Sequence, residues 1–289
     1  MKAAHIMLLL LLTILAMQAS AEPIRVIAIG AHPDDCDIKA GGIAAKYAEA
    51  GHKVRFVSVT NGDAGHQAEG GGMLAARRRE EARESGRRLG VEYLVLDNHD
   101  GELVPSLDVR LQLIRQIREW DADIVIAPRP NDYHPDHRYT GILVQDASYM
   151  VTVPNIASDT PAIRKNPLFL YFSDRFASPQ PFRPDIVVSI DDVVEKKYAA
   201  LDAHVSQFYE WLPWHAGILD QVPRDPGARL EWLKAARSFA IRDAWREAAR
   251  ARYGAAADQI RNAEAFEITE YGAQPEEAEI RRLLPFFPE

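Results

Sequence analysis

Runs of β-branched and other apolar residues alternate with helical segments through the first half of the chain, and this alternation is the feature that most restricts its fold. The apolar runs that we predict as strands are residues 25–30, 54–59, 91–96 and 124–127. The segments predicted as helices between them are residues 38–50, 73–89 and 107–120. Strands that alternate with helices in this way indicate a parallel sheet, because each crossover helix returns the chain to the end of the sheet from which the previous strand started.

The second half of the chain continues the pattern less clearly. Weaker strands are predicted at residues 169–172 and 186–190, and helices at residues 193–208 and 230–253. The predicted fold class is α/β, with a Rossmann-like, doubly wound and mostly parallel sheet, helices on both faces and a C-terminal α/β elaboration. We expect one domain over residues 22–289, with a core of about residues 24–190 and the elaboration at about residues 191–289.

The amino terminus has the three parts of a secretory signal peptide. Lys2 precedes an apolar run at residues 6–17, and the small residues 19–21 form the expected cleavage site. This run is too short to span a bilayer comfortably, and no later segment is apolar enough to do so. We therefore expect residues 1–21 to be removed and the protein to be secreted or periplasmic, without stable membrane insertion.

Charge and cysteine content exclude several classes of function. The chain has 34 Lys and Arg against 42 Asp and Glu, a formal net charge of −8 at pH 7 that disfavours binding to nucleic acids. Its single cysteine, Cys36, rules out an intrachain disulfide and a zinc site built from several cysteines. The expected partner is a small molecule or a glycan, and assembly into a homo-oligomer stays open.

Two clusters of metal-binding and proton-transferring side chains follow the first and fourth predicted strands. The first cluster is His32, Asp34 and Asp35, and the second is His134, Asp136 and His137. With the usual strand order 3-2-1-4-5 these two strands are neighbours, and ligands bind in the crevice where their crossovers leave in opposite directions. We expect both clusters to meet there. A nucleotide is disfavoured, because the first turn offers one glycine and then two carboxylates that would repel a pyrophosphate.

The combined residues suit a divalent metal ion. Two histidines, one carboxylate and an open fourth position describe a catalytic zinc site, although the same set of ligands also suits Fe²⁺. His32 and Asp35 are three residues apart in a turn and are able to converge on one ion. Asp34 between them would be free to accept a proton from a bound water. Spacing alone leaves open whether His134 or His137 is the other ligand.

The sequence resembles the PIG-L / LmbE-like family of zinc-dependent N-deacetylases, of the N-acetylglucosaminyl deacetylase type. The segments that carry the resemblance are residues 31–35, Ala-His-Pro-Asp-Asp, and residues 134–137, His-Pro-Asp-His. Supporting matches are residues 60–65, Arg78 and Glu81 in one helix, Asp100 with Gly101, residues 203–207 and residues 263–267. Together these matches extend over about residues 24–285.

The resemblance implies three zinc ligands, which are His32, Asp35 and His137. It also implies that Asp34 is the general base, that His134 is a protonated imidazole stabilising the oxyanion, and that Asp136 orients His134. The implied reaction removes an N-acetyl group from an amino sugar or glycoconjugate. Cys36 departs from the family pattern, which often has a glutamate there, and we expect it to be a small buried side chain rather than a fourth metal ligand.

Four further residues are predicted to contact the substrate, namely Arg78, Asp63, Asp100 and His204. Asp63 and Asp100 lie on loops that follow predicted strands, where turn formation is the alternative explanation. Arg78 would otherwise pair with Glu81 or Glu84 on the surface of its helix.

Our hypothesis from the sequence is a metal-dependent amide hydrolase, with two alternatives from other classes. A non-haem iron oxygenase would use the same two histidines and one carboxylate, and a non-catalytic carbohydrate-binding protein would keep the fold alone. Asp34 and His134 favour hydrolysis, because iron chemistry does not require them. An amidase that removes a larger N-acyl group falls within the same hypothesis.

Overall fold

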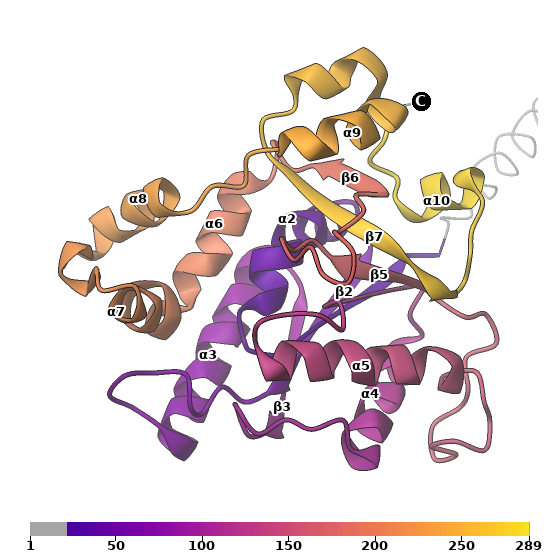
Figure 1. Ribbon diagram of the computed structural model, residues 1–289, viewed down its shortest axis with the longest axis horizontal. Coiled ribbons are helices and arrows are strands. Elements are labelled where there is room, and N and C mark those ends of the chain that lie inside the picture. The colour runs from indigo at the N-terminus through magenta and orange to yellow at the C-terminus, as the bar shows by residue number, and fades with distance from the viewer. Residues whose placement is uncertain (1–21, 289) are drawn as a thin grey trace, which may run out of the picture.

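A seven-stranded mixed sheet forms the centre of the molecule (Figure 1). The computed structural model describes residues 22–288, so the signal peptide predicted at residues 1–21 lies outside the described residues. The strands are β1 (Arg25–Gly30), β2 (Lys53–Thr60), β3 (Glu92–Asn98), β4 (Ile124–Ala127), β5 (Leu168–Phe172), β6 (Ile186–Ser189) and β7 (Ala263–Gly272). Their order across the sheet is β3-β2-β1-β4-β5-β7-β6.

The first five strands are parallel and follow the order that the sequence predicts. β1 pairs with β2 on one side and with β4 on the other, and β5 lies parallel to β4. The bounds predicted for the strands at residues 25–30 and 124–127 agree with β1 and β4. The α/β, doubly wound architecture is thus confirmed, and with it the switch point between β1 and β4.

Helices cover both faces of the sheet (Figure 1). They are α2 (Asp35–Glu49), α3 (Gly71–Leu89), α4 (Leu107–Trp120), α5 (Pro135–Met150), α6 (Val194–Ala203), α7 (Leu212–His215), α8 (Pro226–Ala236), α9 (Arg246–Tyr253) and α10 (Glu277–Leu283). Alternate side chains of β1 enter two separate cores, as the pleat requires. Val26 and Ala28 pack in the core that contains α2, whereas Ile27 and Ile29 pack in the core formed by α4 and α5.

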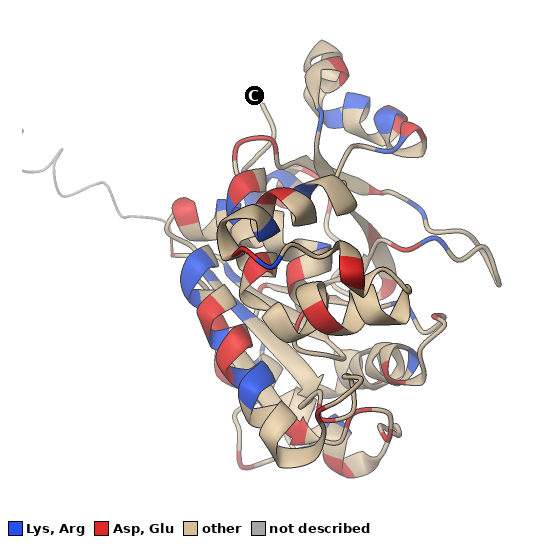
Figure 2. Cartoon of the chain, turned by 90° about the vertical axis from the view of Figure 1, so that its left-hand side faces the viewer, with Lys and Arg blue, Asp and Glu red and all other residues tan. Residues whose placement is uncertain are grey.

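The helix surfaces carry charges of both signs. Figure 2 shows acidic and basic residues interspersed along the helices on the side that it presents. In the part of the chain that the structure describes, no helix combines the length and the apolar composition needed to cross a membrane.

Two helix boundaries differ from the sequence prediction. The helix predicted at residues 193–208 ends at Ala203, and a π-helical segment, Ser206–Trp211, follows it. From the sequence we expect an exit loop over residues 128–137 after the fourth strand, but this loop is shorter, because α5 already begins at Pro135. Proline suits the first helical position, where its missing N–H costs no hydrogen bond.

The segment at residues 230–253 is not the single helix that the sequence predicts. Between α8 and α9 the chain is extended over residues 237–242, which we call the strap. Phe239 packs against the main core, and Ala240 forms an antiparallel bridge with Asn262. These tertiary contacts outweigh the local preference for helix.

Strand β7 lies between β5 and β6 and is antiparallel to both. The sequence does not indicate a strand here, because its glutamates are residues that strands disfavour. Two of them, Glu264 and Glu267, are buried and have partners, since the Glu267 carboxylate accepts the Arg183 amide at 3.0 Å. The partners of these acidic side chains therefore stabilise a strand that the β-propensity of its residues does not predict.

The carboxylate of Glu264 connects β7 to two helices. Its oxygens accept the backbone amides of Gly42 and Ile43 in α2, both at 2.8 Å. The ammonium group of Lys197 in α6 lies 2.5 Å from Oε1, and both charged side chains are buried. Removing one partner of such a pair leaves an uncompensated charge inside the protein.

Replacing Lys197 by methionine should therefore lower the free energy of unfolding by about 3–5 kcal/mol, measured in urea. The matched control is Lys196→Met, because Lys196 makes an equally short contact of 2.5 Å with Glu49 on the surface. Exposed pairs contribute at most about 1 kcal/mol. Equal destabilisation by the two substitutions would contradict the importance of the buried pair.

Candidate active site

The turn between β1 and α2 forms one wall of the candidate site. A side chain at Gly30 would place its Cβ 2.6 Å from the Cβ of Asp35, so this close approach requires glycine. The Asp35 oxygen Oδ2 accepts the backbone amides of Ala31 and His32, each at 2.9 Å. The turn thus fixes the carboxylate of Asp35 with two backbone hydrogen bonds.

The loop between β4 and α5 forms the opposite wall. His134 is the N-cap residue of α5, and its Nδ1 accepts the backbone amide of Asp136 at 3.2 Å. His137 lies in the first turn of the helix. Because β1 and β4 are adjacent, the two clusters predicted from the sequence meet at the carboxyl edge of the sheet.

Three potential metal-binding atoms form a compact triangle. His32 Nδ1 and His137 Nε2 are 3.1 Å apart, and they lie 3.6 Å and 3.4 Å from Asp35 Oδ2. Tetrahedral ligands at about 2.0–2.2 Å from one ion lie about 3.3–3.6 Å from each other. The two distances to Asp35 lie within this range, and the distance between the two imidazoles is about 0.2 Å shorter, so small side-chain adjustments would let the three atoms hold a divalent ion.

Three carboxylates support the two histidines from behind. Asp132 Oδ1 lies 3.0 Å from His137 Nδ1, while Asp100 Oδ1 and Asp136 Oδ2 lie 3.1 Å and 3.4 Å from His32 Nε2. A carboxylate on the far nitrogen fixes the tautomer of a metal-binding histidine and increases its basicity. The sequence analysis did not identify Asp132 as a site residue. Its signal in the sequence is its position two residues before His134, where an aspartate favours a turn. In that turn Asp132 Oδ1 accepts the backbone amide of His134.

The carboxylates and imidazoles shift each other's pKa values in opposite directions. Burial raises the pKa of Asp35, but the charges of His137 and His32 outweigh it and hold the pKa well below its usual range. Burial lowers the pKa of His32, but Asp100, Asp136 and Asp35 together raise it well above its usual value. The site therefore holds several negative charges that need a compensating cation or protons.

His134 also lies close to the triangle. One ligand atom from each of His32, His134 and His137 falls within 4.8 Å of the others. Burial lowers the pKa of His134, and the charges of His32 and His137 lower it further, whereas Asp136 and Asp100 raise it. Because Nδ1 accepts an amide hydrogen, the proton of the neutral ring is on Nε2.

Asp136 orients His134 in a different way from the one expected. Its backbone amide, and not its carboxylate, contacts the His134 ring. The carboxylate is fully buried, and its Oδ2 accepts the Gly101 amide at 2.7 Å and faces His32. Its other oxygen, Oδ1, is buried without a hydrogen-bond partner among residues 22–288.

Arg78 is buried beneath the site. Its guanidinium lies 3.5 Å from Asp34 Oδ1 and 3.7 Å from Asp100 Oδ2, and only 2% of the residue is exposed. A side chain at Gly62 would collide with this guanidinium at 2.5 Å. Arg78 thus positions the Asp34 carboxylate, and its burial weighs against direct contact with a substrate.

Two other predicted substrate contacts are occupied by structural interactions. Asp63 joins two loops, since Oδ1 accepts the Asp100 amide at 3.0 Å and Oδ2 lies 2.6 Å from His99 Nδ1. His204 is fully buried and lies 3.2 Å from the equally buried carboxylate of Asp37. The structure does not bring His204 to the triangle of ligands, and its substrate contact stays a prediction.

Cys36 lies in the first turn of α2 and is buried in the core. Its thiol donates to the Ala28 carbonyl at 3.3 Å. The expectation of a small buried side chain at this position is confirmed.

Comparison with known proteins relates the first half of the chain to one family. Residues 27–148 match the sequence model of the family described as PIG-L, GlcNAc-PI de-N-acetylase. A diacetylchitobiose deacetylase of Thermococcus kodakarensis is 34% identical over 199 residues, which cover 66% of this chain and 73% of the relative. A 4-oxalmesaconate hydratase of Pseudomonas putida is 26% identical over 193 residues, 64% of this chain and 74% of the relative.

Solved structures extend the similarity to most of the chain. The N,N'-diacetylchitobiose deacetylase of Pyrococcus horikoshii superimposes with a TM-score of 0.64 and 29% identity, covering 86% of this chain and 84% of that structure. The similarity therefore includes the C-terminal elaboration as well as the residues that match the family.

Replacing Asp132 by asparagine should weaken Zn²⁺ binding by about 10- to 100-fold, because loss of a carboxylate behind a metal-binding histidine has effects of this size. Competition with a chelator, followed by metal analysis, measures the change. Asp146→Asn is the matched control, because Asp146 lies on the surface of α5, the helix that follows the Asp132 loop, and pairs with Arg110. Unchanged affinity in D132N would show that Asp132 does not support a metal ligand.

Proposed function

The chain belongs to the PIG-L family of de-N-acetylases, and from this membership and the geometry of its site we propose that it hydrolyses the N-acetyl group of an amino sugar or glycoconjugate. The observation that carries the proposal is the triangle of His32, Asp35 and His137 atoms beside the carboxylate of Asp34. The deacetylase relative with 34% identity supports an N-acetylated sugar as the substrate.

We propose His32, Asp35 and His137 as the ligands of a divalent ion, with Zn²⁺ as the first candidate and Fe²⁺ as the alternative. When bound, such an ion polarises the amide carbonyl and makes a water molecule more acidic. The two histidines act as neutral ligands through the nitrogens that face each other. Their other nitrogens keep the carboxylate partners that fix the ring orientation.

Asp34 acts as the general base in this proposal. It follows His32 in the turn but is not a member of the triangle, so its carboxylate is available to accept a proton from the attacking water. Arg78 lies 3.5 Å from one of its oxygens and restricts its orientation. Proton transfer from a positioned carboxylate contributes roughly 10²–10⁴-fold in rate.

His134 supplies the hydrogen bond to the oxyanion. Its Nδ1 is already engaged with the Asp136 amide, so the Nε2–H is the group that remains to donate. A neutral imidazole stabilises developing negative charge in this way without first being protonated. The protonated imidazole that the sequence resemblance implies is the alternative form of the same donor.

The relative with 26% identity supports a second candidate, the addition of water to a double bond. Such a hydration would also use a carboxylate to accept a proton from water, but it would release no acetate. The deacetylase relative has the higher identity, and an amide hydrolase is for that reason the first proposal.

Acetate release from a panel of N-acetyl sugars and glycoconjugates, with the metal content of the protein measured alongside, tests the proposal. We expect metal-dependent acetate release that is equal under aerobic and anaerobic conditions. Dependence on oxygen would favour an iron oxygenase. Inactivity of the metal-loaded protein across the panel would contradict the proposed deacetylation, and tight binding of a sugar without turnover would favour a carbohydrate-binding protein.

Replacing Asp34 by asparagine should lower kcat for acetate release by roughly 10²–10⁴-fold while the bound metal stays unchanged, because the substitution removes the proton acceptor but no ligand. Initial rates and metal analysis of the same sample measure both quantities. Asp108→Asn, on the exposed side of α4, is the control and should keep the wild-type rate. A D34N enzyme as active as the wild type would exclude Asp34 as the general base.

A further inference from the structure

The loop between β2 and α3, residues 61–70, closes over the buried guanidinium of Arg78. Gly62 has a φ of 71°, and a Cβ added there would lie 2.5 Å from Arg78 Nη1. A Cβ added at Gly65 would lie 2.9 Å from the same nitrogen and 3.1 Å from Asp100 Oδ2. The loop backbone therefore forms a close wall around the guanidinium, whose Nη2 lies 3.5 Å from the proposed general base, Asp34.

The polar contacts of Arg78 are long, so this wall matters for its position. Within residues 22–288 its one hydrogen bond runs from Nη1 to the Gly62 carbonyl at 3.4 Å, and its Nε is buried without a partner. Its carboxylate neighbours, Asp34 and Asp100, lie 3.5 Å and 3.7 Å away, whereas charge-assisted hydrogen bonds are about 2.7–2.9 Å long. We conclude that the loop backbone, more than its own hydrogen bonds, sets the place of the guanidinium.

The C-terminal elaboration holds the loop from its outer side. Gln207 belongs to the π-helical segment Ser206–Trp211, and its Nε2 donates to the Gly65 carbonyl at 3.0 Å. Glu210 of the same segment lies 2.9 Å from Nε2 of His66, the next residue of the loop. π-Helical turns are rare and occur frequently at functional sites. Two side chains of this segment thus fasten two consecutive loop residues.

Gln207 is in turn fixed by the helix that carries Arg78. Only 3% of Gln207 is exposed, and its Nε2 also lies 3.3 Å from Ser206 Oγ. The backbone amide and the hydroxyl of Ser206 donate to the two carboxylate oxygens of Glu81, at 2.9 Å and 2.5 Å. Glu81 lies three residues after Arg78 in α3. Buried hydrogen-bond networks of this kind rigidify the segments that they join, so the π-helical segment, the loop and α3 form one unit around Arg78.

We propose that Gln207 is a positioning residue for Asp34. Its hydrogen bond to the Gly65 carbonyl keeps the loop closed on Arg78, and Arg78 keeps the Asp34 carboxylate in the orientation that accepts a proton. The inference rests on the proposed deacetylation, and it gives the C-terminal elaboration a part in the chemistry of residues 27–148. Misplacement of a reacting group by about 1 Å costs about 10²-fold in rate, so a contact outside the site is able to control it.

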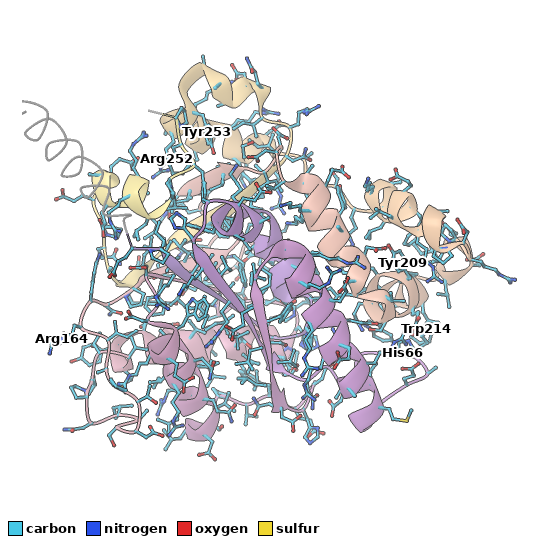
Figure 3. The ribbon with its side chains drawn as sticks, turned by 180° about the vertical axis from the view of Figure 1, so that it is seen from behind. His66, Arg164, Tyr209, Trp214, Arg252 and Tyr253 are labelled. Atoms are coloured by element: carbon cyan, nitrogen blue, oxygen red, sulfur yellow. The ribbon has the colours of Figure 1, made fainter. Side chains whose placement is uncertain are left out.

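Replacing Gln207 by methionine removes the donor and keeps the length of the side chain. We expect Q207M to lower kcat for acetate release by about 10- to 100-fold at unchanged KM and metal content, because only the proton acceptor is displaced. Tyr209→Phe serves as the control and should keep the wild-type kcat. Tyr209 is buried in the same segment, but its hydroxyl donates to Asp202 and not to the loop. Figure 3 shows Tyr209 on the same side of the molecule as His66.

A double-mutant cycle with D34N distinguishes positioning from a general loss of stability. Q207M should lower the small residual rate of D34N much less than it lowers the wild-type rate, because D34N has no proton acceptor left to position. A merely structural role of Gln207 would reduce both rates by the same factor. Equal factors in the two backgrounds, or loss of metal from Q207M, would overturn the proposal while the proposed deacetylation stands.

Gly65→Ala tests the same connection from the loop and decides the matter if Q207M does not fold. The φ of Gly65 lies outside the left-handed region, and the added Cβ meets the end of the flexible Arg78 side chain, which is able to move. We expect a lower kcat in G65A with little change in the midpoint of thermal unfolding. A wild-type kcat in G65A would contradict the proposed connection between the loop and Asp34.

If no sugar releases acetate, the proposed deacetylation fails, and hydrogen exchange then tests the role of Gln207 separately. The backbone amides of residues 62–66 should exchange faster in Q207M than in the wild type or in Y209F, because the loop loses its hydrogen bond to the π-helical segment. Equal exchange in the three proteins would overturn the proposal, since it would show that Gln207 does not hold the loop.

Discussion

Two backbone amides hold one oxygen of Asp35, and the geometry of the candidate site depends on this interaction. The amides belong to Ala31 and His32, and the turn that presents them is possible because Gly30 has no side chain. His32 and His137 reach the same oxygen from neighbouring strands. The positions of the three proposed ligands are therefore set by the backbone and the strand order, independently of a bound ion.

The charges of the site follow from that arrangement. Against the effect of burial, Asp35 and Asp132 raise the pKa of His137, and Asp100, Asp136 and Asp35 raise the pKa of His32. Protons on these rings compensate the acidic groups when no ion is present. A divalent ion has to displace them, so its affinity falls as the pH decreases through the raised pKa values.

The sequence predicts the parts of the site that depend on local signals. Apolar strands followed by His and Asp residues indicate both clusters, and the usual strand order brings them together. The role of Asp132 depends on its distance from His137, and the direction of the Asp136 carboxylate depends on the packing of His32. Spacing along the chain reveals neither of these three-dimensional relations. Strand β7 and the extended strap were not predicted from the sequence, because Glu264 and Phe239 are stabilised by a partner that is distant in the sequence.

The strap has a consequence for how proteins of this architecture diverge. The proposed ligands, the proposed general base and their supporting carboxylates all lie within residues 27–148, whereas the strap begins some ninety residues beyond that segment. The strap contacts α6 through Tyr198 and Lys197, and it pairs with Asn262 just before β7. Substitutions in the strap would therefore alter the packing of the C-terminal part of the chain while the proposed chemical groups stay unchanged.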